Sequence, residues 1–380
     1  MKSLFEAFKT STKKQWLAKV EKDLRGKSLE SLDWIIHENL TVTPFAHRDD
    51  FKKQPTPIFD KRKSNSWEKG AWIFVKNIKT ARREALALLD SGAEAICFEF
   101  ENDPNKDDMD LLLKGIHLEW ISTHFILPYF SWKRIIQSFM TIAREQKNDL
   151  SKVRFSFQFR NPLLVDAKGH KIFNKTTERL DEYPLFCING KPYYDGDNNA
   201  STELANTLRY ANQQLLEWTK NDLPPDKLVH QIQFSLQLGD SYYLNIAKIR
   251  ALKLLWQLLL KGWKIKKQIP CQIAAHLTDT THTKDLNYNQ IKATAQAMAA
   301  VIGGANRIFI YPSDTYKNKK GTQNRQRLAL NIQHLMQLES YMDRVIDPAA
   351  GSYFLENLTD KIAAAAWEEF SKELADKPIN

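Results

Sequence analysis

Alternation of strand-like and helix-like segments most constrains the fold of this chain. From about residue 70 onward, short runs rich in β-branched and aromatic residues alternate with longer stretches whose apolar residues recur every three or four positions. Eight such βα units over about 300 residues predict a (β/α)8 barrel. A doubly wound open sheet is the alternative, because strand number alone does not show closure. We expect strands at 72–75, 95–100, 118–121, 155–159, 185–188, 232–237, 272–277 and 307–311, and helices at 80–90, 132–146, 201–219, 242–260, 290–303 and 324–340.

A rigid turn precedes the last predicted helix. Asp347 and Pro348 begin an Asp-Pro-x-x-Gly run that ends at Gly351, and the proline and glycine are both typical of a tight ordered turn. The apolar residues 353–355 are then expected as a short strand-like piece. Asn357 is expected to cap a helix whose apolar residues fall on one stripe.

The first 55 residues differ in pattern from the rest. One helix is predicted at residues 13–24, with Trp16, Val20 and Leu24 on one face and Gly26 after it. Short β-type pieces at 33–36 and 40–42 and several prolines follow. We therefore expect an arm over residues 1–55 that contacts a partner subunit, followed by a barrel over residues 60–375.

Composition narrows the class of protein. With 43% hydrophobic and 11% aromatic residues, the chain is typical of soluble globular proteins, and no window approaches the ~18 uninterrupted apolar residues of a membrane span. A cytoplasmic location is the expectation. The net charge of +10 favours acidic partners, but its densest clusters, at 61–63, 261–267 and 317–320, are short and are interpreted as solvated faces.

Several cysteines and histidines are candidates for a metal or disulfide site. Cys97, Cys187 and Cys271 are isolated from one another and are expected to be buried free thiols, so no disulfide framework or structural zinc site is predicted. His276 and His282 lie six positions apart. Two histidines that bind one metal ion usually lie four positions apart on a helix or two apart on a strand, so this pair is not predicted to be a metal site.

Acidic residues lie near the ends of two predicted strands. Glu99 and Glu101 could point the same way at a strand end, but nothing beside them supplies a nucleophile, a metal ligand set or a phosphate loop. The polar run that contains Asp195, Asp197 and Asn199 is interpreted as a helix-capping loop, because a predicted helix begins directly after it.

Ordered sequence blocks carry a family resemblance. The segment at 347–359 with the Ala-rich helix after it resembles the part that closes the substrate-binding barrel of methylmalonyl-CoA mutases. Further blocks are similar to that family in the same order, and the arm resembles that of the small subunits of two-chain bacterial forms; these blocks lie at 16–34, 85–100, 247–256, 297–304 and 327–340.

The resemblance implies a function and a cofactor for the complex. In this family the barrel holds the pantetheine chain of a coenzyme A ester, and a separate C-terminal domain brings adenosylcobalamin to the barrel mouth. Cobalamin supplies the radical that rearranges methylmalonyl-CoA to succinyl-CoA, while the protein binds and orients the substrate.

The positions that matter for this chemistry carry other residues here. The family's cobalt-ligating Asp-x-His-x-x-Gly element is absent from this sequence. Lys191 and Pro192 stand at the positions of the family's active-site Tyr and His, and proline has no side-chain donor. The block that presses on the corrin ring corresponds to residues 273–278, and the coenzyme-clamping entry corresponds to residues 63–70, both with different residues.

Three hypotheses follow. The favoured one is a non-catalytic small subunit that forms a heterodimer with a large subunit; the chain itself contributes no catalytic residue and binds no cofactor or metal, and adenosylcobalamin is carried by the partner. The second is an acyl-CoA mutase barrel that works with a cobalamin domain supplied in trans, and residual acyl-CoA binding stays open. The third is an orphan basic-surface binding protein. No nucleic-acid motif and no membrane segment support other partners.

Overall fold

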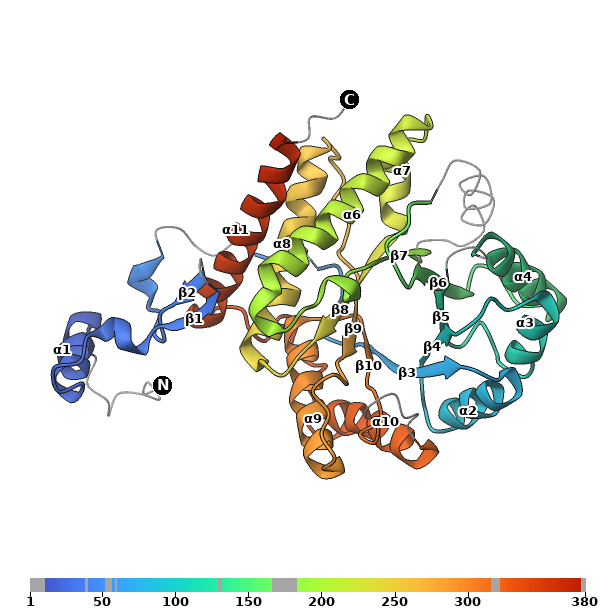
Figure 1. Ribbon diagram of the computed structural model, residues 1–380, viewed down its shortest axis with the longest axis horizontal. Helices are drawn as coiled ribbons and strands as arrows, with labels where there is room; N and C mark the ends of the chain where they lie inside the picture. The colour runs from blue at the N-terminus through green and yellow to red at the C-terminus, as the bar shows by residue number, and fades with distance from the viewer. Residues whose placement is uncertain are drawn as a thin grey trace, which may run out of the picture.

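A closed eight-stranded parallel barrel forms the body of the chain in the computed structural model (Figure 1), which describes residues 11–37, 40–51, 57–58, 60–128, 132–165, 183–315 and 322–376. The predicted (β/α)8 barrel is therefore confirmed, and the open sheet is wrong. Around the barrel the strand order is β10-β3-β4-β5-β6-β7-β8-β9, so the last strand closes the sheet against the first.

The elements follow the expected alternation. The strands are β3 (Glu68–Val75), β4 (Ala95–Phe100), β5 (Ser122–Leu127), β6 (Arg154–Phe159), β7 (Phe186–Asn189), β8 (Ile232–Leu238), β9 (Ile273–Leu277) and β10 (Arg307–Phe309). The helices around them are α2 (Ile78–Asp90), α3 (Lys106–Leu113), α4 (Trp132–Glu145), α6 (Ala200–Lys220), α7 (Pro225–Leu228), α8 (Tyr242–Gly262), α9 (Leu286–Gly303), α10 (Gln323–Leu338) and α11 (Tyr353–Asp376).

The main core lies between the outer face of the barrel and the helices. Phe125 of β5 packs edge-on against Phe139 of α4 at 5.6 Å, and Phe139 contacts Phe155 of β6 at 4.3 Å between ring centroids. All three rings are at most 1% exposed. Aromatic packing of this kind fixes α4 against the sheet and leaves the inward strand positions to form a separate interior.

One predicted strand was wrong and one helix was missed. Residues 118–121 form a turn, and the strand is Ser122–Leu127. The apolar residues at 118–121 favoured a strand there. The true strand was missed because its residues Ser122 and His124 point into a polar barrel interior. Helix α3 was overlooked although Asn105 and Asp108 form a capping box at its start.

The turn at 347–351 is confirmed, but the strand-like piece after it is not. Helix α11 begins at Tyr353, four residues before the expected Asn357 cap. The cause is Glu356, whose Oε1 accepts a hydrogen bond from the Gly351 N–H at 3.0 Å and ties the turn to the first helical turn. Gly351 and Asp347 both have positive φ, which shows how sharply the chain reverses here.

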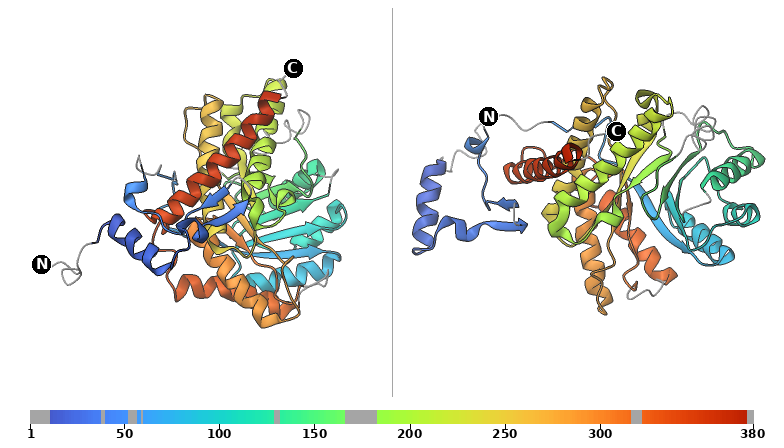
Figure 2. Two further views of the ribbon diagram at one scale, coloured as in Figure 1. Left: turned by 60° about the vertical axis from the view of Figure 1, so that its left-hand side comes forward. Right: turned by 45° about the horizontal axis from the view of Figure 1, so that its top comes forward.

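An arm projects beside α11 at the start of the chain (Figures 1 and 2). It consists of α1 (Lys13–Asp23), an antiparallel pair formed by β1 (Trp34–His37) and β2 (Leu40–Val42), and two short 3-10 turns, Leu29–Leu32 and Arg48–Asp50. Lys361 of α11 donates to the Thr41 carbonyl at 2.7 Å, and the Phe51 ring lies 5.7 Å from Tyr353. No residue of α1 is buried, so this helix makes little core with the described part of the chain.

Candidate functional site

The barrel interior is the natural place to look for a site, and it is polar rather than aliphatic. Barrel interiors are usually filled by layers of branched apolar side chains. Here the inward positions carry mostly hydroxyl, amide, imidazole, thiol and guanidinium groups, including Ser122, His124, Ser156, Gln158, Cys187, Gln233, His276 and Arg307. An interior of this composition is stable only if its polar groups bind one another or a ligand.

A charged network fills the amino-terminal end of the interior. Glu68 of β3 accepts from Arg307 Nε at 3.0 Å, from Arg154 at 3.1 Å and from the Ser122 hydroxyl at 2.8 Å. Arg307 also donates to Gln233 and, at 2.7 Å, to the hydroxyl of Tyr183. Burial opposes the charge of Arg307, but Tyr183 and Glu68 outweigh it and raise its pKa. Each of the three guanidinium nitrogens therefore already donates to a partner within the chain.

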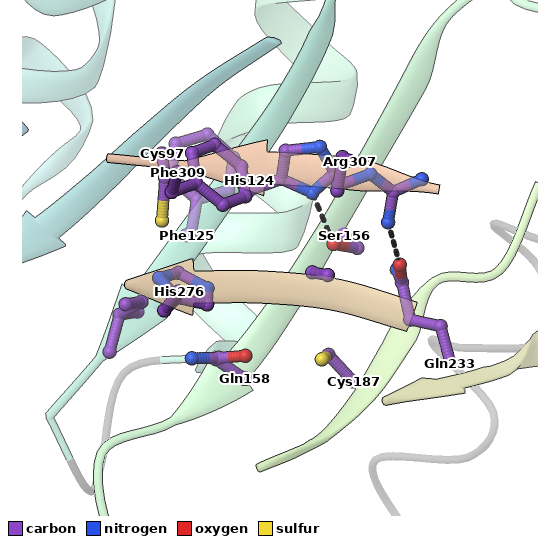
Figure 3. A pocket seen from close by; sticks show the side chains of 12 residues that line it. Cys97, His124, Phe125, Ser156, Gln158, Cys187, Gln233, His276, Arg307 and Phe309 are labelled. Atoms are coloured by element: carbon purple, nitrogen blue, oxygen red, sulfur yellow. Dashed lines mark hydrogen bonds between the residues drawn. The ribbon is translucent and has the colours of Figure 1, made fainter. Parts of the chain in front are cut away.

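Imidazole and thiol groups occupy the middle of the interior (Figure 3). His124 Nδ1 lies 2.6 Å from the Ser156 hydroxyl, and its Nε2 lies 3.0 Å from Ser122. Burial, and then the neighbouring cation of Arg307, lower the pKa of His124, so its ring is neutral. Burial raises the pKa of Cys187 to about 12, which keeps this thiol protonated and unreactive.

Lys191 reaches into the carboxyl-terminal mouth. Its ammonium donates to the Tyr311 hydroxyl at 3.2 Å, and Tyr311 packs edge-on against Trp72 at 4.6 Å. Burial opposes the charge of Lys191, but Tyr311 and Glu99 raise its pKa, so it stays protonated. Trp72 Nε1 in turn donates to Glu99 at 3.0 Å. These four side chains contact one another in a row at the carboxyl-terminal end, where barrel enzymes usually bind substrate.

Little space remains inside. The cavity on the barrel axis has a volume of about 10 Å³. Drug-sized ligands occupy pockets of roughly 300–1,000 Å³, whereas about 10–15 Å³ holds a single water molecule. Around this cavity the described side chains therefore leave room for about one water molecule on the barrel axis.

The structure separates the predicted site residues. Pro192 is exposed in the short turn Lys191–Tyr193, while the Lys191 side chain points inward. Glu101 is exposed and Glu99 is held by Trp72, so the two acids do not face one another as a pair. His282 Nδ1 lies 2.7 Å from the Thr315 carbonyl, away from His276 in β9. Among the described residues no group of three or more His, Cys, Asp or Glu side chains could hold a metal ion.

Three other expectations can be placed. The three cysteines are free and buried, as predicted. The block at 273–278 runs through β9, which is buried along its whole length. Within the 63–70 block, Asn65 donates to the Val301 carbonyl at 2.9 Å and Glu68 anchors the interior network.

The 195–199 run leads directly into α6, as predicted for a helix-capping loop, but no side chain caps the helix. Asn199 occupies the N-cap of α6, but its side chain makes no capping bond. Asp197 instead accepts from the Ser241 N–H at 2.6 Å and from the Tyr194 hydroxyl at 3.2 Å. The run joins the ends of β7 and β8 at the mouth.

Sequence reasoning missed the residues that fill the barrel. Arg307, Phe309 and Tyr311 lie at alternate positions of one predicted strand and so share one face of it. An arginine at the start of an otherwise apolar strand was the available signal for a buried charge. Their partners lie on other strands, and Glu68 is 239 positions away from Arg307 in the sequence. No local pattern reports such a pairing.

Comparison with known proteins points to one family. A profile of the family described as methylmalonyl-CoA mutase matches residues 105–374. A methylmalonyl-CoA mutase small subunit from Porphyromonas gingivalis is 28% identical over 97% of this chain and 63% of its own length. A probable methylmalonyl-CoA mutase small subunit from Mycobacterium tuberculosis is 32% identical over 48% of this chain and 31% of its own length. The chain thus spans less than two-thirds of either relative.

Among solved structures, the Yersinia pestis dihydropteroate synthase covers 72% of this chain and 94% of its own at 13% identity, with a TM-score of 0.37. That similarity is too loose to bear on function. No helix in the described part of the chain is long and apolar enough to cross a membrane.

Proposed function

The chain belongs to the methylmalonyl-CoA mutase family, and we propose that within this family it is a non-catalytic small subunit. On this proposal a large partner subunit carries adenosylcobalamin and converts methylmalonyl-CoA to succinyl-CoA, and the present chain pairs with it and stabilises it. The similarity to proteins named as small subunits supports the assignment.

The filled barrel interior is the observation that carries the proposal. A pantetheine chain along the axis would have to displace Arg307 from Glu68, Gln233 and Tyr183. Removing one partner of a buried ion pair costs roughly 3–5 kcal/mol, and a ligand would have to recover that free energy before it bound at all. A barrel closed in this way supports a structural role better than residual acyl-CoA binding.

The mouth of the barrel supports the same proposal. A thioester carbonyl needs a hydrogen-bond donor placed to stabilise charge that develops on its oxygen. Pro192 offers no side-chain donor and faces solvent. Lys191 is a donor, but its ammonium is directed to Tyr311 inside the mouth.

The two histidines of the described barrel interior do not fit adenosylcobalamin. The histidine at the mouth end of β9, His276, is 2% exposed and lies inside the barrel, so its ring cannot reach a corrin outside it. His124 is 6% exposed with both ring nitrogens bonded to serines. We therefore assign no step of the reaction to cobalamin bound by these residues.

The arm is the part that we assign to the partner. Trp16, Val20 and Leu24 of the α1 region form a half-buried apolar stripe, and no residue of α1 is buried by the described chain. An isolated helix of 11 residues is marginal in water, so packing against another surface would stabilise it. The large subunit is the proposed surface.

Co-expression with the candidate large chain tests the proposal. We expect a stoichiometric complex by native mass spectrometry and size-exclusion chromatography. Val20→Asp should weaken the complex, whereas the matched control Ala18→Asp, at an exposed position of the same helix, should leave it intact. Two chains that elute separately would refute the pairing.

A second experiment distinguishes the mutase barrel that works in trans. Calorimetric titration of this chain with methylmalonyl-CoA should show no saturable binding, and a mixture with a cobalamin-domain protein and adenosylcobalamin should show no turnover. Binding together with turnover would favour the alternative and overturn the non-catalytic role.

A further inference from the structure

Two buried polar groups inside the barrel have no hydrogen-bond partner. Gln158 of β6 is 5% exposed and His276 of β9 is 2% exposed, and neither Gln158 Nε2 nor His276 Nδ1 has a partner in the structure. Both side chains line the same axial cavity, and Figure 3 shows them among the side chains that surround it. An unpaired buried donor or acceptor is costly, and native proteins rarely leave one without a partner.

One small polar molecule can serve both atoms. An amide nitrogen can only donate, whereas Nδ1 of a neutral imidazole donates in one tautomer and accepts in the other. Burial, followed by the charge of Lys191, lowers the pKa of His276, so its ring is neutral. A molecule that accepts from Gln158 Nε2 and can either donate to or accept from His276 Nδ1 would satisfy both atoms at once.

Size selects the molecule. The cavity volume of about 10 Å³ is at the lower limit for one water and is too small for an organic ligand. The thiols of Cys97 and Cys187 also line the cavity and supply further weak donors and acceptors. A cavity lined only by apolar atoms would stay dry, but this one has the two to four polar partners that a buried water needs.

We propose that the barrel axis contains a binding site for one water molecule, bridging Gln158 Nε2 and His276 Nδ1. The site joins the hydrogen-bonded middle of the interior to the mouth, because His276 stacks on Phe309 at 4.8 Å and Phe309 contacts His124 at 5.7 Å. The water thereby completes the packing of an interior that holds no larger ligand. The proposal concerns the packing of the barrel and does not depend on the role of the chain as a subunit.

A high-resolution crystal structure tests the site directly. We expect one density peak within about 2.7–3.2 Å of both Gln158 Nε2 and His276 Nδ1. In solution, an exchange cross-peak between a long-lived water and the His276 ring protons should be present. An empty cavity in the crystal with no such cross-peak would overturn the proposal.

Two substitutions of matched shape should change the folding equilibrium constant in opposite directions, depending on whether the cavity holds a water molecule or is empty. Gln158→Met and His276→Phe each remove one polar group. If a water bridges the pair, each variant should lower the folding equilibrium constant by about 5- to 10-fold, and the double variant should lose less than the product of the two. If the cavity is dry, each variant removes an unpaired group and should raise the constant instead.

The exposed glutamine Gln137 provides the control. Gln137→Met makes the same chemical change on the surface of α4 and should leave the folding equilibrium constant within about 2-fold of the parent. Circular dichroism of each variant before denaturation separates a stability change from a failure to fold.

Discussion

Arg250 provides the sharpest test of how the fold is closed. It lies in the middle of α8, is 1% exposed, and donates to Asp347 and, at 2.7 Å, to Glu356 Oε2. The same Glu356 holds the Gly351 N–H through its other oxygen. Replacing Arg250 with Met keeps a long apolar side chain but removes the countercharge of both carboxylates.

The magnitude follows from the burial of the two acids. Breaking a buried pair by removing one partner costs about 3–5 kcal/mol. The side chain of Glu356 is 8% exposed and stays buried, whereas that of Asp347 is 25% exposed and can be rehydrated. We therefore expect Arg250→Met to lower the free energy of unfolding by about 3 kcal/mol, near the lower end of that range.

Urea denaturation followed by tryptophan fluorescence measures the loss. The double variant Arg250→Met/Glu356→Gln should recover part of it, because the amide is uncharged and its oxygen can still accept from Gly351. Lys261→Met, at an exposed position near the end of the same helix, is the control and should change stability by less than about 0.5 kcal/mol. A loss below about 1 kcal/mol for Arg250→Met would refute the reasoning that this network holds the turn.

Three further outcomes are expected. Burial opposes the charge of Asp60, but Arg62 and Lys253 outweigh it and lower the pKa of Asp60 to about 2. About 2 kcal/mol of stability is therefore present above the unfolded pKa near 4 and should be lost as the pH falls toward 2. Asp60→Asn should abolish this pH dependence in urea titrations. The three buried cysteines should react with a thiol reagent only in denaturant, since burial raises their pKa values; prompt labelling of the native chain would contradict this. Gly239→Ala should destabilise the chain by roughly 1–3 kcal/mol, because an added Cβ would clash with the Asp197 carboxylate and the Tyr194 hydroxyl; an unchanged melting temperature would show that these side chains move aside freely.

Sequence patterns located most elements because buried apolar residues recur every three or four positions in a helix and every second position in a strand. They failed at β5, where inward Ser122 and His124 broke the apolar run that a strand usually presents. They also failed at the start of α11, where Glu356 accepts from Gly351 and pulls the helix start forward to Tyr353. At β5 the polar character of the barrel interior, and at α11 a hydrogen bond between residues five positions apart, outweighed the apolar pattern.

The candidate site was predictable only in part. The sequence placed Lys191 and Pro192 where the related enzymes carry other residues, and it left open whether the barrel could still bind a coenzyme A ester. It contained no sign that the Lys191 ammonium turns inward to Tyr311 while Pro192 faces solvent.

The sequence by itself determined the alternation of strands and helices, the family and the turn before the last helix, because each is read from residues close together in the chain, but it left closure of the sheet open. Only the tertiary structure decided that the interior is full. That outcome depends on the summed volumes and the pairing of side chains from all eight strands, such as Glu68 with Arg307. A closed sheet brings these side chains to one axis, and whether they leave a channel or a space of about 10 Å³ is settled by packing.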